Sequence, residues 1–169
     1  PGNEKPKSSA KQLCPKGAPV KNFSVVAINT ALKFNPNTED EIEVDFERKL
    51  LLTNADAKIF ALEGEMAKAA TDGKHPHPLT LRANIGECIK IKLTNRLKKS
   101  NASIHANNIA FDPLDSQGIN VGNNPGDQTV KPGKSKIYTF YAHEDFNING
   151  ALLWDFGDVT SNIRSGMYG

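Results

Sequence analysis

The sequence has no long apolar run and no dense cluster of positive charge, and these absences exclude two kinds of partner. No segment approaches the ~20 apolar residues that a membrane-spanning helix needs, so the sequence predicts no membrane span. Twenty-one basic against nineteen acidic residues leave a net charge of only +2. The lysines do not form the basic stripe with interleaved aromatic residues that nucleic-acid-binding proteins show. We therefore expect no nucleic acid as a partner.

The sequence also lacks the common short motifs of catalytic sites and of zinc knuckles. It has no Gly-x-Ser-x-Gly elbow, no phosphate-binding loop and no dinucleotide-binding fingerprint. Its two cysteines, Cys14 and Cys88, do not have the local spacing of a zinc knuckle or a redox Cys-x-x-Cys pair. They either form one long-range disulfide in an oxidising compartment or remain two unrelated thiols, with Cys88 in the core.

Short strands dominate what is present. The 169 residues are enough for one domain with its own core. We expect an N-terminal arm over residues 1–20, which begins with a lysine-, serine- and proline-rich stretch, and one domain over residues 21–169. Alternating or β-branched runs, bounded by glycine, proline and asparagine turns, predict strands at 21–29, 42–46, 79–83, 88–94, 103–111, 136–142 and 150–154.

One segment has helical periodicity instead. Between Lys58 and Ala70, apolar residues recur at roughly helical spacing, and the following Asp72-Gly73 pair supplies a stop. The sequence therefore predicts one short surface helix in an otherwise all-β domain. Many short strands joined by such turns are typical of a Greek-key β-sandwich or barrel.

Four segments resemble, in their order and spacing, the cupredoxin domain of multicopper oxidases of the laccase and ceruloplasmin type. They are the Leu-Thr-Leu-Arg-Ala-Asn-x-Gly-Glu-Cys run that starts at Leu79, the region 102–124, a Pro-Gly turn that leads into an aromatic strand at 127–140, and the small-residue stretch Ser165–Gly169. The resemblance implies a cupredoxin-like sandwich or barrel and copper as the cofactor of the parent protein.

The copper-ligand motifs of that family are degenerate here. The family carries two His-x-His pairs, and in a strand such alternate residues aim both imidazoles at one copper site. The first pair reads His105-Ala-Asn107, so an amide replaces one imidazole. The second falls at Trp154–Asp158, where Asp155 and Gly157 match the histidines. No Cys-x4-His-x4-Met set for a mononuclear copper is present, so the resemblance implies no complete copper site in this chain.

The remaining histidines have two interpretations each. His105 is either a residual copper ligand that a partner domain completes, or a strand histidine that is hydrogen-bonded within a former interface. His75 and His77 form another His-x-His in a proline-rich linker, where they either capture metal or stay solvated.

In the family, the stretch at Ser165–Gly169 leads into an apolar strand that completes the domain. We therefore expect this domain to lack its final strand, and the chain to be a piece of a larger protein or a subunit that another chain completes.

The leading functional hypothesis is a cupredoxin domain of a secreted or periplasmic multicopper-oxidase-type protein, packed against other cupredoxin domains. Those domains would bind the copper and transfer electrons from substrate to dioxygen, whereas this chain alone would not be catalytic. The alternative is a non-catalytic cupredoxin-fold module for interaction or assembly. A third hypothesis is a small copper carrier that uses His105 with His75 and His77.

Overall fold

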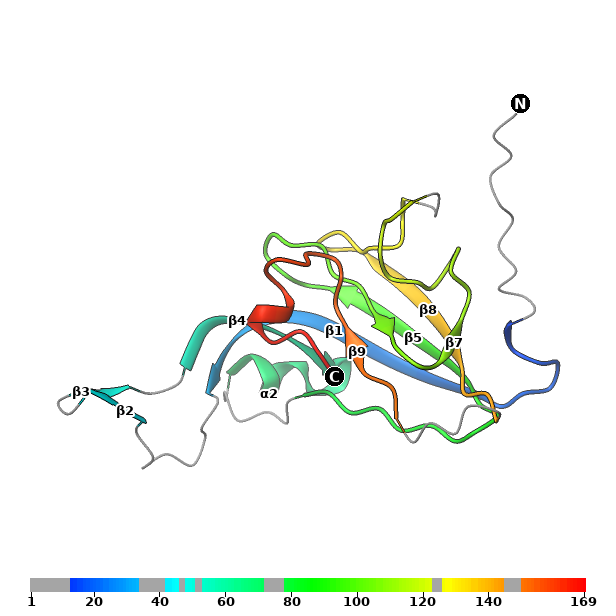
Figure 1. The fold of residues 1–169 in the computed structure, drawn as a ribbon, viewed down its shortest axis with the longest axis horizontal. Coiled ribbons are helices and arrows are strands. Elements are labelled where there is room, and N and C mark those ends of the chain that lie inside the picture. Colours follow the sequence, from blue (N-terminus) through cyan, green and yellow to red (C-terminus); the bar gives the residue numbers. More distant parts are fainter. Residues whose placement is uncertain are drawn as a thin grey trace.

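A twisted β-sheet and the loops that cover its inner face make up most of the described structure (Figure 1). The computed structural model of the chain describes residues 13–33, 42–45, 48–50, 53–71, 78–122, 126–144 and 150–169. His75 and His77 lie outside these residues, as do the first twelve residues of the expected arm.

The main sheet has five strands in the order β4-β1-β5-β8-β7. Its central strand β5 (Cys88–Asn95) runs parallel to β1 (Val20–Lys33) and antiparallel to β8 (Ser135–Tyr141). The outer strands are β4 (Thr53–Leu62), antiparallel to β1, and the short β7 (Ala110–Phe111), antiparallel to β8. The expected strands at 21–29, 88–94 and 136–142 are thereby confirmed.

Two small ladders lie beside the main sheet in the described part of the chain. β6 (His105–Ala106) pairs with β9 (Leu153–Trp154), and β2 (Ile42–Asp45) pairs with β3 (Arg48–Leu50). The helical segments with bounds in the described residues are the 3-10 turns η1 (Glu63–Glu65) and η2 (Ile163–Ser165), and the short α-helix α2 (Met66–Thr71). No helix in the described residues is long and apolar enough to cross a membrane.

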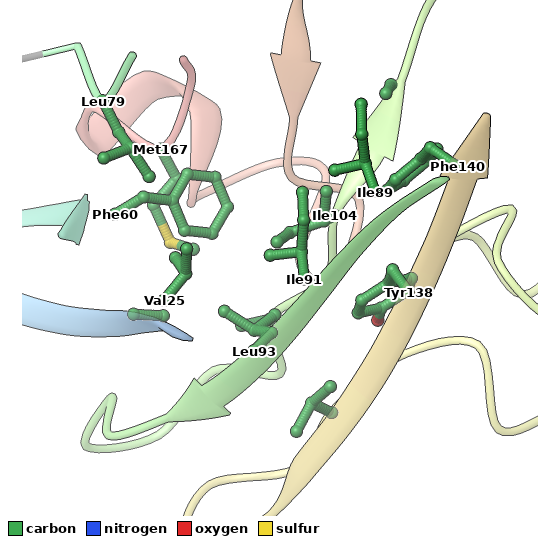
Figure 2. Close-up of a cluster of buried hydrophobic side chains, with 14 of the residues drawn as sticks. Val25, Phe60, Leu79, Ile89, Ile91, Leu93, Ile104, Tyr138, Phe140 and Met167 are labelled. Carbon is green, nitrogen blue, oxygen red and sulfur yellow. The ribbon is translucent and has the colours of Figure 1, made fainter. Parts of the chain in front are cut away.

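The apolar core lies on both faces of the sheet because successive residues of a strand point in opposite directions. In β1, Val25 enters the main cluster and Val26 enters a second, smaller one beneath α2. Figure 2 shows the main cluster, in which large side chains from β4, β5 and β8 meet Ile104 and Met167 from the covering segments. The full burial of such side chains contributes roughly 1.5–3 kcal/mol each to the free energy of folding.

The predicted helix over 58–70 is wrong in its first half. Residues up to Leu62 belong to β4, and the α-helix begins only at Met66. Ile59 faces the smaller cluster and its neighbour Phe60 faces the main one, which is the alternation of a strand. Pairing of Ile59 with Ile28 of β1 outweighs the helical spacing, since tertiary contacts commonly override such weak local signals.

Three further strand predictions need correction. The expected strand 150–154 is reduced to β9 at Leu153–Trp154. Residues 79–83 form no strand and belong to no ladder among the described residues. The expected strand 103–111 is divided into β6 and β7 by a turn at Asn107–Asn108. Asn108 adopts a positive φ of 60°, a conformation that asparagine tolerates better than most residues and that breaks a strand.

Cys14 and Cys88 form a disulfide, with an S–S distance of 2.02 Å and a sequence separation of 74. This is the first of the two alternatives that the sequence leaves open. The bond attaches the segment before β1 to the first residue of the central strand β5.

Reduction of this disulfide should destabilise the chain. A cross-link across 74 positions restricts the unfolded chain, and the entropy model gives about 4 kcal/mol, with about 2–4 kcal/mol as the usual range. Urea unfolding of the oxidised and dithiothreitol-reduced chain measures the difference in the free energy of unfolding. A Cys14→Ala/Cys88→Ala variant that does not respond to the reductant is the control. Coincident urea midpoints for oxidised and reduced chain would contradict the expectation.

Candidate functional site

His105 occupies the first residue of β6, directly across from Trp154 of β9. Its half-buried ring lies edge-on to two phenylalanine rings, with centroid distances of 5.5 Å to Phe111 and 5.2 Å to Phe156. The imidazole is therefore held in one orientation by aromatic neighbours from β7 and from the loop after β9.

Both ring nitrogens of His105 are engaged. Nδ1 lies 2.6 Å from the backbone carbonyl oxygen of Gln117, which can only accept, so Nδ1 carries a proton and donates it. Nε2 lies 3.0 Å from the side-chain amide of Asn107. Either the ring is doubly protonated and donates to the amide oxygen, or the amide is turned and its NH2 donates to Nε2. In both arrangements, Nε2 is hydrogen-bonded to Asn107, and its lone pair is not available to a metal.

Asp155 is fully buried and serves as a hydrogen-bond acceptor. Its Oδ1 accepts from the backbone N–H of Ser103 at 2.6 Å, and its Oδ2 accepts from the side-chain amide of Asn162 at 2.7 Å. The backbone N–H groups of Gly157 and Asp158 also donate to Oδ2, at 3.1 and 3.4 Å. Burial raises the pKa of this carboxyl above its ordinary value, while the hydrogen bonds from Ser103 and Asn162 oppose the rise.

Gly157 lies where no side chain fits. A Cβ atom at this position would come within 2.6 Å of the backbone N and Cα of Ala102. The loop after β9 thus presses against the chain just before β6. A histidine could not replace Gly157 without displacement of one of these two segments.

The structure does not bring His105 and the three degenerate ligand positions, Asn107, Asp155 and Gly157, together into one site. His105 and Asn107 contact each other, but the hydrogen bonds of Asp155 go to other residues, and Phe156 is the member of the loop whose ring touches His105. Among the described residues, no three His, Cys, Asp or Glu side chains lie close enough to hold a metal. One imidazole, one amide and a glycine with no room for a side chain do not form a ligand set for a copper cluster.

No protein-family model matches this sequence, and no curated protein matches it as a relative. Its fold does match solved structures. A multi-copper oxidase from Pseudomonas thermotolerans has a TM-score of 0.57 at 16% identity, over 90% of this chain and 29% of that one. Another multicopper oxidase gives 0.53 at 19% identity, over 98% and 45%. Fet3p, a multicopper oxidase that functions in iron import, gives 0.50 at 19% identity, over 89% and 22%.

The fold is that of a multicopper oxidase cupredoxin domain. The predicted fold class and the resemblance found in the sequence are both confirmed. At 16–19% identity the likeness shows the fold alone. The chain spans less than half the length of each of these three structures.

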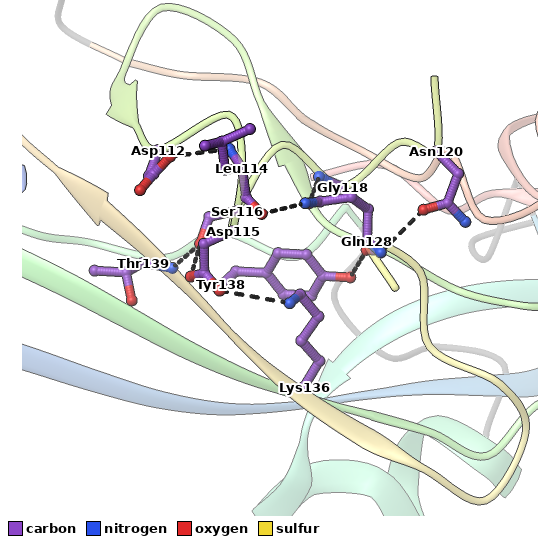
Figure 3. A network of polar contacts seen from close by, with 10 residues as sticks. All are labelled: Asp112, Leu114, Asp115, Ser116, Gly118, Asn120, Gln128, Lys136, Tyr138 and Thr139. Carbon is purple, nitrogen blue, oxygen red and sulfur yellow. Dashed lines mark hydrogen bonds and ion pairs between the residues drawn. The ribbon is translucent and has the colours of Figure 1, made fainter. Parts of the chain in front are cut away.

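Sequence reasoning missed the polar network that shapes the cupredoxin-like domain around His105. Buried Gln128 accepts a hydrogen bond from the backbone N–H of Gly118 and donates one to the carbonyl of Leu114, so it closes the loop that carries Gln117 (Figure 3). The hydroxyl of Tyr138 in β8 donates to the backbone carbonyl of Gln128 at 2.6 Å, which fixes the loop on the sheet. These contacts join residues 10 to 14 positions apart across loops without a regular period, and only the Gln-Thr-Val segment of the resemblance pointed to this region.

A buried lysine was missed as well. Lys58 in β4 donates from Nζ to the hydroxyl oxygens of Ser100 and Ser161, at 3.0 and 2.6 Å, and to Oδ1 of Asn162 at 2.8 Å. Because Asn162 also donates to Asp155, the ammonium group and the buried carboxylate share one hydrogen-bonded network. The sequence of β4 gives no sign that the charged side chain of Lys58 points into the protein.

Gly157→Ala should destabilise the domain by at least about 2 kcal/mol, because the new methyl group overlaps backbone atoms of Ala102 that cannot rotate away. The matched control is Gly64→Ala, where a Cβ meets nothing within 4 Å and the expected change stays within about 0.5 kcal/mol. Thermal and urea unfolding of both variants against wild type measure the effect. Equal stability of the two variants would contradict the close contact.

Proposed function

We propose that this chain is a cupredoxin-like domain of a larger multicopper-oxidase-type protein, in which it supplies structure and an interface while other cupredoxin domains bind the copper. The observation that carries the proposal is the contact of His105 Nε2 with Asn107. On a fold shared with multicopper oxidases, an amide occupies the position of the second imidazole and engages the first.

Copper in the neighbouring domains would accept electrons from a substrate and deliver them to dioxygen. The residues of this chain would take no part in that step. Their role is to keep the β6–β9 ladder rigid, through the buried Asp155 on one side and the Gln117 contact on the other. A rigid ladder presents a fixed surface to an adjacent domain.

A secreted or periplasmic location is part of the proposal. Two features support it: the Cys14–Cys88 disulfide, which persists in an oxidising compartment, and the fold shared with multicopper oxidases. The chain spans 22–45% of the three matched structures, which leaves room in such proteins for the partner domains that we propose.

The second candidate is a non-catalytic interaction or assembly module on the same fold. The close backbone contact at Gly157 favours this second candidate. No side chain fits at this position, so it cannot supply a metal ligand of any kind. The copper-carrier hypothesis gains no comparable support, since Asn107 engages the nitrogen that the carrier would use.

The intact mass and the metal content of natively purified material separate these candidates. We expect a polypeptide or complex much larger than 18.4 kDa that contains copper, and no copper retained by this chain after denaturing separation and refolding. Metal analysis of the native and the separated fractions provides both values. A lone chain without copper would contradict the oxidase proposal and leave the interaction module. Stoichiometric copper on the refolded chain would support the carrier instead.

A further inference from the structure

The sequence contains two Asn-x-Ser motifs that the proposed function leaves unused. One is Asn22-Phe-Ser in β1, and the other is Asn101-Ala-Ser, which lies between β5 and β6. This tripeptide is the acceptor motif for N-linked oligosaccharides in secreted proteins, provided that the middle residue is not proline. Because so short a motif also arises by chance, the surroundings of each asparagine decide which of the two can carry a bulky, hydrated oligosaccharide.

In the first motif, both polar side chains point to solvent. Asn22 and Ser24 are exposed, whereas Phe23 between them packs against the main core cluster. The alternation of a strand is the cause, because it sends residues 22 and 24 to the outer face of the sheet, opposite the main cluster. The side-chain amide of Asn22 makes no hydrogen bond among the described residues. Its nitrogen can therefore carry a substituent without the loss of a contact.

The outer face around Asn22 is polar in the described part of the chain. The helix α2 covers this face only farther along β1, where Val26 belongs to the second cluster. The residue beside Asn22 across the sheet is Lys90 of β5, which in turn pairs with Thr139 of β8. Lys90 and Lys92 are both exposed, as charged side chains usually are. An oligosaccharide at this place displaces no packed side chain of the described residues.

The second motif is part of the interior instead. Ala102 and Ser103 are fully buried, and Ala102 forms a β-bridge with Val130 through backbone hydrogen bonds of 2.9 and 2.7 Å. The side chain of Asn101 is half-buried, and its amide nitrogen lies 3.3 Å from the hydroxyl oxygen of Thr129. A substituent on this nitrogen would disturb the contact with Thr129 directly beside the buried bridge.

We propose that Asn22 is an acceptor site for an N-linked oligosaccharide and that Asn101, despite the same motif, is not. In the transfer, Nδ2 of Asn22 attacks C1 of the first sugar of a lipid-pyrophosphate-linked oligosaccharide. The N–C1 bond forms as the bond from C1 to the pyrophosphate oxygen breaks. The lipid pyrophosphate leaves with the electron pair of that bond, and the amide nitrogen loses one proton to a base of the transferase. The proposal rests on the secreted or periplasmic location that is part of the proposed function.

An oligosaccharide on Asn22 also limits where a partner domain contacts this chain. It keeps the outer face of β1 and β5 in water, because a bulky hydrated group prevents close packing over the strand that carries it. The β6–β9 ladder packs on the inner side of the sheet, where Ala106 and Leu153 contact the main cluster. Modification at Asn22 is therefore compatible with the domain contact that we propose at this ladder.

Peptide mapping of the natively purified protein tests the proposal. A non-reducing digest is treated with an amidase that releases N-linked oligosaccharides and converts the asparagine that carried them to aspartate, in water labelled with oxygen-18. Mass spectrometry then identifies labelled aspartate at each motif and, in the same digest, the state of the Cys14–Cys88 disulfide. We expect the label at position 22 in most chains and unmodified asparagine at position 101.

Variants of the full chain, exported through the secretory pathway of a eukaryotic expression host, provide matched controls. Ser24→Ala removes the motif but leaves Asn22 in place, and it should abolish the label at position 22. Ser24→Thr keeps the motif and should keep the label. Residue 24 is exposed, so both variants should fold and retain the disulfide.

An intact disulfide together with unmodified Asn22 in the native protein would overturn the proposal and leave the proposed location standing. Free thiols at Cys14 and Cys88 together with unmodified Asn22 would overturn both. An oligosaccharide on Asn101 of the folded, oxidised chain, or a label at position 22 in Ser24→Ala, would also overturn the proposal. The measurement needs no copper, so the absence of a copper-containing complex would not affect a positive result.

Discussion

The buried carboxylate of Asp155 joins the chain before β6 to the loop after β9, and the surroundings of His105 depend on that joint. It accepts hydrogen bonds from the backbone of Ser103 and from Asn162, and the same loop brings Gly157 against Ala102. Between these two contacts lies Phe156, whose ring packs on His105. A carboxylate removed from water must be satisfied in this way, so the loop has little freedom to move.

The contacts at this joint use both positions that the resemblance matched to a second His-x-His pair. Asp155 serves there as a hydrogen-bond acceptor, and Gly157 is a point of close backbone contact. The side-chain amide of Asn107 adds to these contacts. It can accept a hydrogen bond from a protonated Nε2 of His105 or donate one to an unprotonated Nε2. The β6–β9 ladder is thus held in place by hydrogen bonds and close packing of protein groups.

Local sequence pattern predicted several strands of the main sheet but few of the contacts in the candidate site. Alternation identified β5 and β8 because each has one face in the core, and the turn at Asn84–Glu87 was visible from its glycine. The same reasoning failed at residues 58–62, where cross-strand pairing with β1 decides the structure. It could not find the Lys58–Asn162 contact, since a separation of 104 residues leaves no trace in local periodicity.

Asn107 engages Nε2 of His105, the ring nitrogen that copper would have to bind because Nδ1 already donates to Gln117. Nitrogen-15 NMR of the His105 ring, before and after addition of one equivalent of copper(I), tests this most directly. We expect a protonated Nδ1 and a hydrogen-bonded Nε2, with neither signal changed by the metal. A shift of Nε2 to the value of a metal-bound imidazole, with loss of its contact to Asn107, would contradict the account.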